Sequence, residues 1–285
     1  ATDGQRVYAM YAIGDLAAFD FDGKQVWVRS LGIPKNAYGH ATSLGLFRNL
    51  LLVQFDQASA KEGKSKLMAL DGATGKTVWE TPRPVPNSWC TPIVVEWKGQ
   101  EQIIAGGDPW VIAYHPADGK EIWRVKCLGH DVAASPVFAD GVVYVANDNA
   151  KATAIRIDGR GDVSASHTLW IAEDGLPDTA SPLATPQYVL LLTSSGMLTG
   201  YDAKSGKKLW EKEFESGFKA SPTLVDKNVY LIGDEGKAWV VEPTPAECKN
   251  VAEANLGEPC AATPAFQDGR IYLRGKQNLY CVGAK

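Results

Sequence analysis

The sequence predicts an all-β fold, a β-propeller of four-stranded antiparallel blades, because two short patterns recur along its whole length and no segment predicts a convincing helix. The first pattern is a hairpin in which an apolar strand ends in an acidic residue, a turn closes on Gly-Lys and a second strand carries a tryptophan. Leu198 to Trp210 is its clearest copy. Other copies are Leu16 to Trp27, Leu67 to Trp79, Val111 to Trp123 and, more loosely, Ala152 to Trp170.

The second pattern lies upstream of each hairpin: Ser or Thr, then Pro, an apolar strand, a polar turn and another apolar strand. Its copies are about 40 to 48 residues apart, which is the period of a propeller blade. Each repeat therefore holds four strands, A to D in chain order, and packing the blades side by side covers both faces of each sheet. The sites are Thr91-Pro92, Ser135-Pro136, Ser181-Pro182, Ser221-Pro222 and Thr263-Pro264, with Ser43-Leu44 as a variant.

The positions of the B strands show which strands the first and last repeats contain. Seven are visible, so residues 1–285 are expected to form a single propeller domain whose first blade lacks strand A and whose last blade lacks strand D. Because two blades are then incomplete, we expect sequence to be missing at the N-terminus and an intact molecule of seven or eight blades. The predicted B strands are Val7 to Ala12, Leu50 to Gln54, Gln102 to Ala105, Val142 to Ala146, Tyr188 to Thr193, Asn228 to Ile232 and Arg270 to Leu273.

Three segments depart from the pattern. The fourth blade expands its C–D turn across Asp158 to Ser166, and the sixth replaces it with Pro243 to Glu247 and carries no repeat tryptophan. The second blade contains a polar insert, Asp56 to Ser65, which predicts a solvated loop. The segment Glu247 to Leu256 is the one weak helix candidate, and it lies where a strand is due.

Composition excludes several classes of function. A formal net charge of -4, with lysines spread singly over turns, argues against nucleic-acid binding. No run of about 18 apolar residues predicts a membrane span. Five cysteines without a CxxC pair argue against a zinc ribbon and against a complete disulfide framework.

The combination of Ser/Thr-Pro, a Val-Tyr-Val-type strand, Leu-x-Ala-aromatic-Asp and Gly-Lys-x-x-Trp resembles the quinoprotein-like (PQQ-like) propeller repeat. Quinone-dependent alcohol dehydrogenases and outer-membrane assembly lipoproteins of the BamB type share this repeat. The resemblance implies that the repeat tryptophan docks one blade against the next, since an indole fills a large flat gap while its N–H reaches a carbonyl. These tryptophans are Trp27, Trp79, Trp123, Trp170 and Trp210.

Catalytic chemistry finds little support in the sequence. A quinone-dependent enzyme of this family would bring two adjacent cysteines and a calcium site, but no two cysteines are adjacent and no ligand set can be assigned. Asn147, Asp148 and Asn149 could offer oxygens to calcium, yet no returning Glu accompanies them. The four histidines are dispersed, and no nucleophile, metalloprotease or phosphate-loop motif is present. We therefore expect no catalytic residues, no PQQ and no calcium.

Propeller geometry predicts where a binding site would lie. Because strands alternate in direction, the loops before strand A and those between strands B and C emerge together, here named the channel-mouth face, while the Gly-Lys turns lie opposite. Its residues are either solvated turn residues or anchors for a partner. Aspartates predominate, which would favour a basic partner. The candidates are His40, Asp56, Trp89, Asp108, Trp110, His130, Asp131, Asp148, Asp178, Phe218, Lys219, Asp234 and Glu235.

These observations predict a non-catalytic scaffold that binds a protein or peptide partner on the channel-mouth face. The family resemblance implies the periplasm or cell envelope of a bacterium, where peripheral membrane association is compatible with the absence of a membrane-spanning segment. Two alternatives from other classes stay open. One is a quinoprotein-type oxidoreductase or another enzyme with its site at the channel mouth, and the other is a ligand-binding or sensor domain of a longer protein.

The role expected for the repeat tryptophans can be tested at Trp123. Truncation of a docking indole leaves a large void, so Trp123→Ala should lower the free energy of unfolding by about 3 to 5 kcal/mol. Denaturant unfolding measures the loss. An unchanged midpoint would contradict the assignment.

Overall fold

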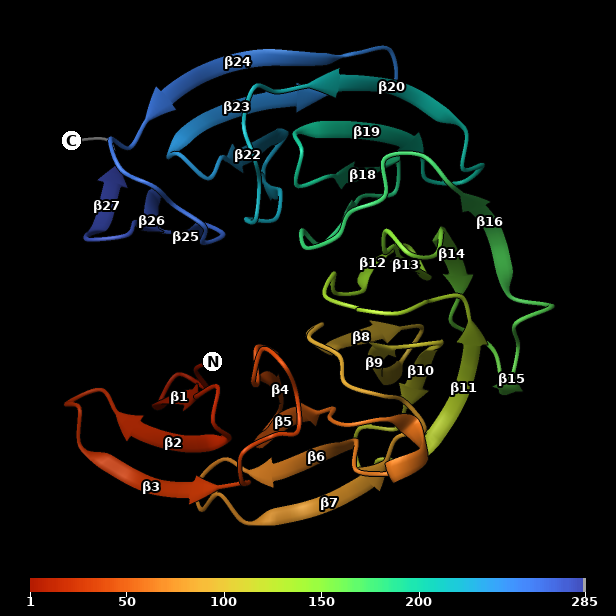
Figure 1. Ribbon diagram of the computed structural model, residues 1–285, viewed down its shortest axis with the longest axis vertical. Helices are drawn as coiled ribbons and strands as arrows, with labels where there is room; N and C mark the ends of the chain where they lie inside the picture. Colours follow the sequence, from red (N-terminus) through yellow and green to blue (C-terminus); the bar gives the residue numbers. More distant parts are fainter. Residues whose placement is uncertain (284–285) are drawn as a thin grey trace. The chain divides into compact units, whose positions relative to one another are not determined.

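The computed structural model describes residues 1–283, which fold as β-strands with one short 3₁₀ helix (Figure 1). They form two compact units, residues 1–136 with 156–168, and residues 137–155 with those from 169 onward. Among the described residues, four sheets have four strands, the first and last have three, and the third has a fifth strand added at its edge. This organisation confirms the predicted fold class of four-stranded antiparallel propeller blades.

The first three sheets follow the chain in order, and each strand pairs with its neighbour in sequence. A 3₁₀ helix, η1 (Ala60–Glu62), lies between the second and third strands of the second sheet. The strands are β1 (Arg6–Met10), β2 (Asp15–Asp20), β3 (Gln25–Ser30), β4 (Gly45–Phe47), β5 (Leu50–Phe55), β6 (Lys66–Asp71), β7 (Thr77–Pro82), β8 (Ile93–Trp97), β9 (Gln100–Gly107), β10 (Trp110–Tyr114) and β11 (Glu121–Lys126).

The remaining sheets repeat this order. The strands are β12 (Val137–Ala139), β13 (Val142–Val145), β14 (Ala152–Arg156), β15 (Gly161–Asp162), β16 (Thr168–Ala172), β17 (Leu183–Ala184), β18 (Tyr188–Leu192), β19 (Met197–Asp202), β20 (Lys208–Glu213), β21 (Thr223–Val225), β22 (Asn228–Ile232), β23 (Lys237–Pro243), β24 (Cys248–Asn255), β25 (Ala265–Gln267), β26 (Arg270–Arg274) and β27 (Leu279–Gly283).

The predicted B strands correspond to β1, β5, β9, β13, β18, β22 and β26. The weak helix candidate at Glu247 to Leu256 is the strand β24, because it pairs with β23 to complete the sixth sheet. In the first sheet, Thr2 forms a single bridge with Val7, and Ala1 and Tyr8 exchange two backbone hydrogen bonds. These first residues pair with β1 on the side where a strand A would lie.

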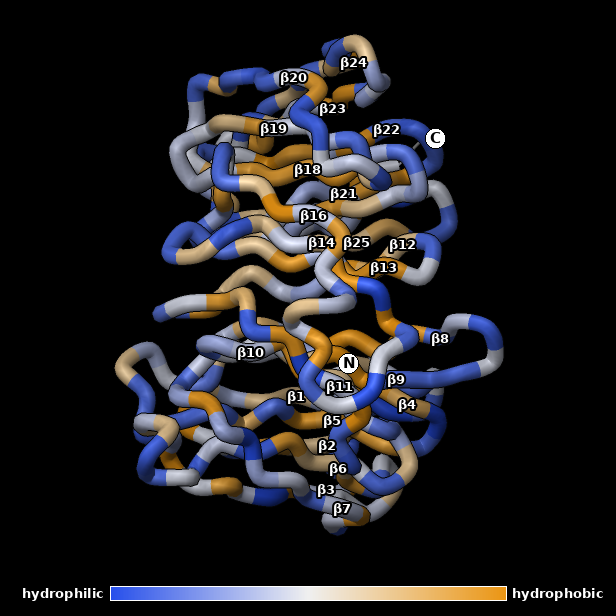
Figure 2. The backbone as a smooth tube through the Cα atoms, turned by 90° about the vertical axis from the view of Figure 1, so that its right-hand side faces the viewer, coloured by the Kyte–Doolittle hydropathy of each residue, from blue (hydrophilic) through white to orange (hydrophobic). Residues whose placement is uncertain are grey.

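Within each unit the apolar cores lie between consecutive sheets. Every residue of β5 is buried, and alternate side chains serve opposite faces, as the two-residue period of a strand requires. Leu51 and Val53 pack toward the first sheet, whereas Leu50 and Leu52 pack toward the third. Figure 2 shows the same pattern as hydrophobic strands and hydrophilic loops. An inner strand of this kind has no solvent face, so its blade requires both neighbours.

The repeat tryptophans connect neighbouring sheets by hydrogen bonds. In four of them the indole N–H donates to a backbone carbonyl just past strand C of the following sheet, so a buried polar group is satisfied where the ring packs. Tyr8 and Tyr144 also donate to two of these same carbonyls. The indole bonds run from Trp27 to Gly72 (2.9 Å), from Trp79 to Pro116 (3.0 Å), from Trp170 to Ala203 (2.9 Å) and from Trp210 to Thr244 (2.8 Å).

The glycine of the Gly-Lys turn is required by the neighbouring indole. Gly75 has a φ of 69°, and a Cβ added there would lie 2.8 Å from the ring of Trp27. Gly119 stands in the same relation to Trp79, and Gly206 to Trp170. The glycine therefore has two functions: it adopts the left-handed turn and it leaves room for the tryptophan of the preceding blade.

Trp123 uses an intermediary. It is fully buried, and its indole N–H donates to the side-chain oxygen of Gln102, 2.8 Å away in its own sheet. The amide of Gln102 in turn donates to the carbonyl of Ile157 at 3.0 Å. The expanded turn that follows Ile157 adds β15 in parallel to β11, at Trp123 and Arg124. This added strand makes the third sheet five-stranded.

The Ser/Thr-Pro sites form a second series of links between sheets. The hydroxyls of Thr91, Ser135, Ser221 and Thr263 each accept the backbone N–H of the corresponding residue one repeat earlier, and the proline that follows favours an extended backbone at these residues. These bonds are 2.9 to 3.0 Å long. They run from Ser43 to Thr91, from Thr91 to Ser135, from Ser181 to Ser221 and from Ser221 to Thr263.

Two turn glycines separate the cost of backbone strain from the cost of crowding the indole. Gly23 has a φ of 81°, and a Cβ added there would have no atom within 4 Å, whereas Gly75 faces Trp27. Gly23→Ala should cost about 1 kcal/mol for the left-handed backbone alone. Gly75→Ala should cost about 1 to 3 kcal/mol more, because the added methyl crowds the ring. Urea unfolding of the two variants measures the difference, and equal losses would contradict it.

Ser221 tests the hydroxyl series. Ser221→Ala leaves the N–H of Ser181 without its acceptor, which should cost about 1 to 3 kcal/mol. Ser221→Thr keeps the hydroxyl and should retain most of the stability, since threonine occupies the same position at Thr91 and Thr263. Thermal unfolding of the pair provides the measurement. If alanine and threonine had the same effect, the hydroxyl would not be the stabilising group.

Candidate binding site

The residues predicted for the channel-mouth face divide between the two units and differ in exposure. In the first unit, His130 and Asp131 are exposed, whereas Asp108 and Trp110 are half-buried. Trp110 packs against the core between the second and third sheets, and the Arg124 guanidinium lies over its ring at 5.1 Å. Trp110 is therefore already engaged within the protein.

The prediction that Asp56 contributes to an exposed face is wrong, because Asp56 is buried in an ion pair. Its Oδ1 accepts a hydrogen bond of 2.8 Å from Nε of Arg83, and neither side chain has any exposed surface. Ser88 and Gln54 donate to the other oxygen at 2.7 and 2.9 Å. The predicted solvated insert is likewise buried at its far end, where Ser65 is 1% exposed.

Arg83 extends this network into the third sheet. Its two terminal nitrogens donate to the carbonyl of Gly106 (2.7 Å) and to the hydroxyl of Tyr114 (3.0 Å). Burial lowers the pKa of Arg83, but the Asp56 carboxylate and Tyr114 outweigh it and raise that pKa above its usual value. Burial raises the pKa of Asp56, against the opposing effect of Arg83. Removing one partner would leave a buried charge unpaired, so the pair serves as a structural link.

His40 and Trp89 lie in loops before strand A and are both half-buried. The His40 ring stacks on Phe55, with centroids 5.7 Å apart, and burial lowers the pKa of His40 and so favours the neutral ring. Trp89 packs edge-on against Tyr38 at 5.3 Å. Tyr38 is 73% exposed, so it is the aromatic side chain of this group that a partner can reach.

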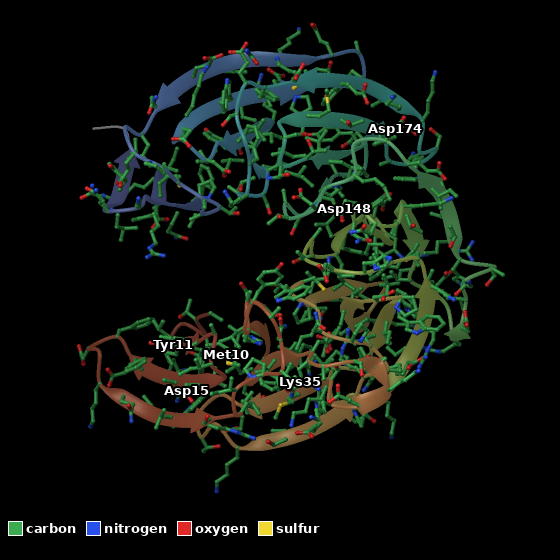
Figure 3. All side chains as sticks on the ribbon, viewed as in Figure 1. Met10, Tyr11, Asp15, Lys35, Asp148 and Asp174 are labelled. Carbon is green, nitrogen blue, oxygen red and sulfur yellow. The ribbon has the colours of Figure 1, made fainter. Side chains whose placement is uncertain are left out.

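In the second unit, Asp148 is exposed in the loop between β13 and β14 (Figure 3), and Asp178 accepts a hydrogen bond from the backbone N–H of Ser194. Phe218 corrects a prediction: it is fully buried and belongs to the core with Phe214 and Trp239. The polar pattern of its loop gave no sign that this side chain points inward.

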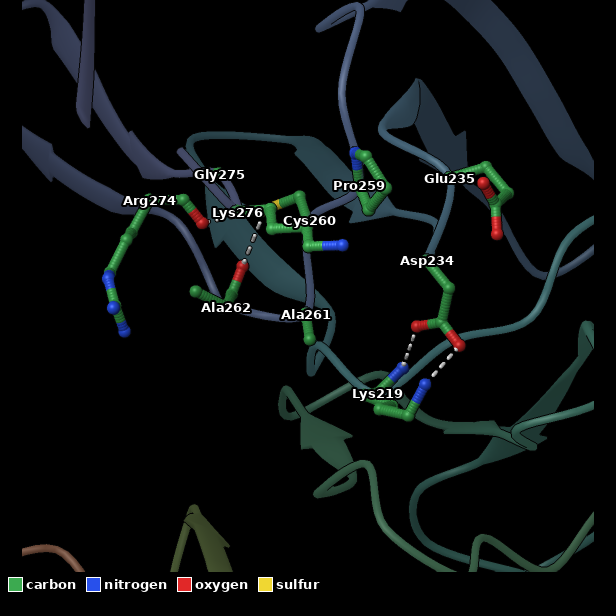
Figure 4. A pocket seen from close by; sticks show the side chains of 10 residues that line it. All are labelled: Lys219, Asp234, Glu235, Pro259, Cys260, Ala261, Ala262, Arg274, Gly275 and Lys276. Carbon is green, nitrogen blue, oxygen red and sulfur yellow. Dashed lines mark hydrogen bonds and ion pairs between the residues drawn. The ribbon is translucent and has the colours of Figure 1, made fainter. Parts of the chain in front are cut away.

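The other three predicted residues of this unit meet in one cavity. Lys219, Asp234 and Glu235 line a space of about 620 Å³, together with the segment 259–262 and the turn 274–276. Figure 4 shows Asp234 facing Lys219 at the right of the view, whereas Arg274 lies at the left. The cavity thus combines loops before strand A with loops between strands B and C, as the propeller geometry predicts.

Asp234 holds the cavity together. Its Oδ1 accepts the backbone N–H of Lys219 at 3.1 Å, and its Oδ2 accepts the ammonium of the same residue at 2.6 Å. This hydrogen bond raises the pKa of Lys219. The Asp234 backbone also donates to Gly217 (2.8 Å) and accepts from Cys260 (3.0 Å), so three loops are fixed by one residue. A role in positioning the loops follows for Asp234.

Arg274 and Lys276 supply positive charge that sequence reasoning missed. They flank Gly275, which is buried, in the turn between β26 and β27. Within residues 1–283 neither side chain forms an ion pair. The cavity is therefore not the acidic surface that the aspartates of the loops suggested. The signal was present in the sequence as an Arg-Gly-Lys turn, but in a repeat whose pattern has decayed.

A quinone-dependent enzyme with this repeat is expected to carry two adjacent cysteines and a calcium site. No two of the five cysteines are adjacent in the sequence, and none of them forms a disulfide in the described residues. No group of three or more His, Cys, Asp or Glu side chains in the described part of the chain is placed to hold a metal ion.

Comparison with known families agrees with the repeat pattern. The model of the family described as "Outer membrane protein assembly factor BamB" matches residues 1–88, 63–244 and 196–284. The chain belongs to this family. A curated relative, outer membrane protein assembly factor BamB of Moranella endobia (strain PCIT), is 26% identical over 263 residues and covers 83% of the chain. The chain spans 62% of the length of this relative.

Solved structures show the same fold. BamB from Moraxella catarrhalis matches with a TM-score of 0.72 and 15% identity, covering 98% of this chain and 79% of that one. Saccharomyces cerevisiae Sqt1 matches with a TM-score of 0.71 at 11% identity, covering 100% and 83%. Within residues 1–283 of this BamB-family chain, no helix is long and apolar enough to cross a membrane.

Proposed function

We propose that this chain is a non-catalytic protein-binding scaffold of the bacterial periplasm that serves the assembly of outer-membrane proteins. The observation that carries the proposal is the family match over nearly the whole chain, in which the repeats that define the fold are retained. The proposed role requires neither PQQ nor calcium, and the absence of adjacent cysteines from the sequence supports this.

We place partner binding at the loops around the 620 Å³ cavity, not at the Gly-Lys turns. The hydrogen bonds of Asp234 hold three of these loops in fixed positions, so a partner meets a preformed surface. Binding to a preformed surface costs less conformational entropy than binding to mobile loops. The Gly-Lys turns, in contrast, are engaged in blade packing through their glycines.

A rescue experiment tests this proposal. In a bacterium that lacks its own BamB-type gene, the full-length wild-type protein should restore the barrier of the outer membrane to large antibiotics. The double variant Glu235→Lys with Arg274→Glu inverts charges in the cavity while conserving net charge, and it should not rescue. Lys207→Glu with Glu247→Lys inverts charges on the opposite turns and should rescue fully.

Growth on antibiotic, at matched protein levels, is the measurement. Failure of the wild-type protein would contradict the envelope role. Equal loss in both variants, with folding intact by circular dichroism, would contradict the choice of surface.

A further inference from the structure

The charged side chains that line the cavity differ in whether they have an ion-pair partner. On one side, Lys219 is neutralised by Asp234, whose two oxygens are both occupied. On the other side, Arg274 and Lys276 are exposed and without an ion pair in the described residues. Three of the five charged side chains that line the cavity are basic. The positive charge of the β26–β27 turn is thus available to a ligand.

Glu258 lies beside this turn but forms no ion pair with Arg274 or Lys276 in the described residues. Glu258 accepts hydrogen bonds from the backbone N–H of Gln277 (2.7 Å) and of Asn278 (3.1 Å), and from the amide of Asn278 (3.1 Å). A hydrogen bond from Tyr280 adds to these and lowers the pKa of Glu258. Because its oxygens hold the turn in shape, Glu258 stays with the backbone and leaves Arg274 and Lys276 free.

The same turn is rigid, which suits recognition. The N–H of Lys276 donates to Pro259 and that of Gly275 to Asn278, both at 2.9 Å, and the thiol of Cys260 donates to the carbonyl of Arg274 at 3.3 Å. A Cβ on Gly275 would displace the Glu258 carboxylate, which is hydrogen-bonded to the same turn, so glycine suits the position between the two cations. The backbones that carry Arg274 and Lys276 are therefore fixed beside the cavity.

We infer that the cavity binds an acidic stretch of polypeptide, whose carboxylates contact Arg274 and Lys276. That the ligand is a polypeptide rests on the proposed function. Guanidinium and ammonium groups form charge-assisted hydrogen bonds with carboxylates, and a volume of about 620 Å³ lies in the usual range of ligand sites. The chain carries a net charge of -4, so general attraction would favour a basic ligand instead. Binding of an acidic one must come from a local site.

Two fluorescent peptides of equal length test the inference, one alternating Glu and Ser, the other alternating Lys and Ser. In low salt, fluorescence anisotropy should show binding of the Glu peptide and weaker or no binding of the Lys peptide. Arg274→Glu with Lys276→Glu should weaken the Glu peptide by about tenfold or more, and added salt should weaken it in the wild type. Lys204→Glu with Lys207→Glu makes the same change of charge on the opposite turn and should leave the affinity unchanged.

Tighter binding of the Lys peptide, no binding of the Glu peptide, or an equal loss in the Lys204 and Lys207 control would overturn the inference. Displacement of the Glu peptide by inorganic phosphate at equal concentration would assign the site to a small anion instead. If the charge-reversed variant does not fold by circular dichroism, the neutral variant Arg274→Gln with Lys276→Gln replaces it, with the same expected direction.

The peptide assay and the rescue assay test different claims, so one can fail while the other succeeds. A wild-type protein that rescues but does not bind the Glu peptide keeps the proposed function and loses the acidic ligand. A protein that binds the Glu peptide through Arg274 and Lys276 but does not rescue keeps the ligand chemistry and loses the envelope role.

Discussion

The contact between one blade's indole and the next blade's C–D turn is the constraint on which the rest of the structure depends. For Trp27, Trp79 and Trp170, the turn must offer both a carbonyl to the indole N–H and a glycine to the ring face. Gly72 and Gly75 meet both demands for Trp27, and Ala203 and Gly206 meet them for Trp170. Because the inner strands are buried on both faces, this contact also determines how the apolar faces of neighbouring sheets align.

This contact separates the turns that have a structural role from the loops that are available for binding. The C–D turns of the second, third and fifth blades contact the indole of the preceding blade and keep the Gly-Lys pair. The loops before strand A and between strands B and C accept none of the indole hydrogen bonds, and their sequences differ from blade to blade. In the sixth and seventh blades those loops form a cavity held by Asp234, and in the second and third blades they hold the buried Asp56–Arg83 pair. Variable loops on a fixed scaffold are where binding residues are expected.

The fold could be predicted from sequence because its determinants are local and repeated. Gly-Lys-x-x-Trp and Ser/Thr-Pro recur at one period, and each copy supports the others. The site residues could be predicted only in part. Loop geometry correctly places Lys219, Asp234 and Glu235 together. It fails for Asp56, because the partner Arg83 is 27 residues away and belongs to no repeated motif. It fails for Phe218, because one inward side chain in a polar loop leaves no periodic signal.

Charged side chains have different roles in this protein, depending on whether they are buried or exposed to water. Arg83 has no exposed surface, and in so apolar a place a guanidinium persists only with its carboxylate and its acceptors all present, as they are. Arg274 needs no such partner, because water solvates it at the cavity. A cation left unpaired at an exposed and rigid site costs little stability and retains its full capacity to bind an anion. That difference separates the charges that hold the blades together from those available to a partner.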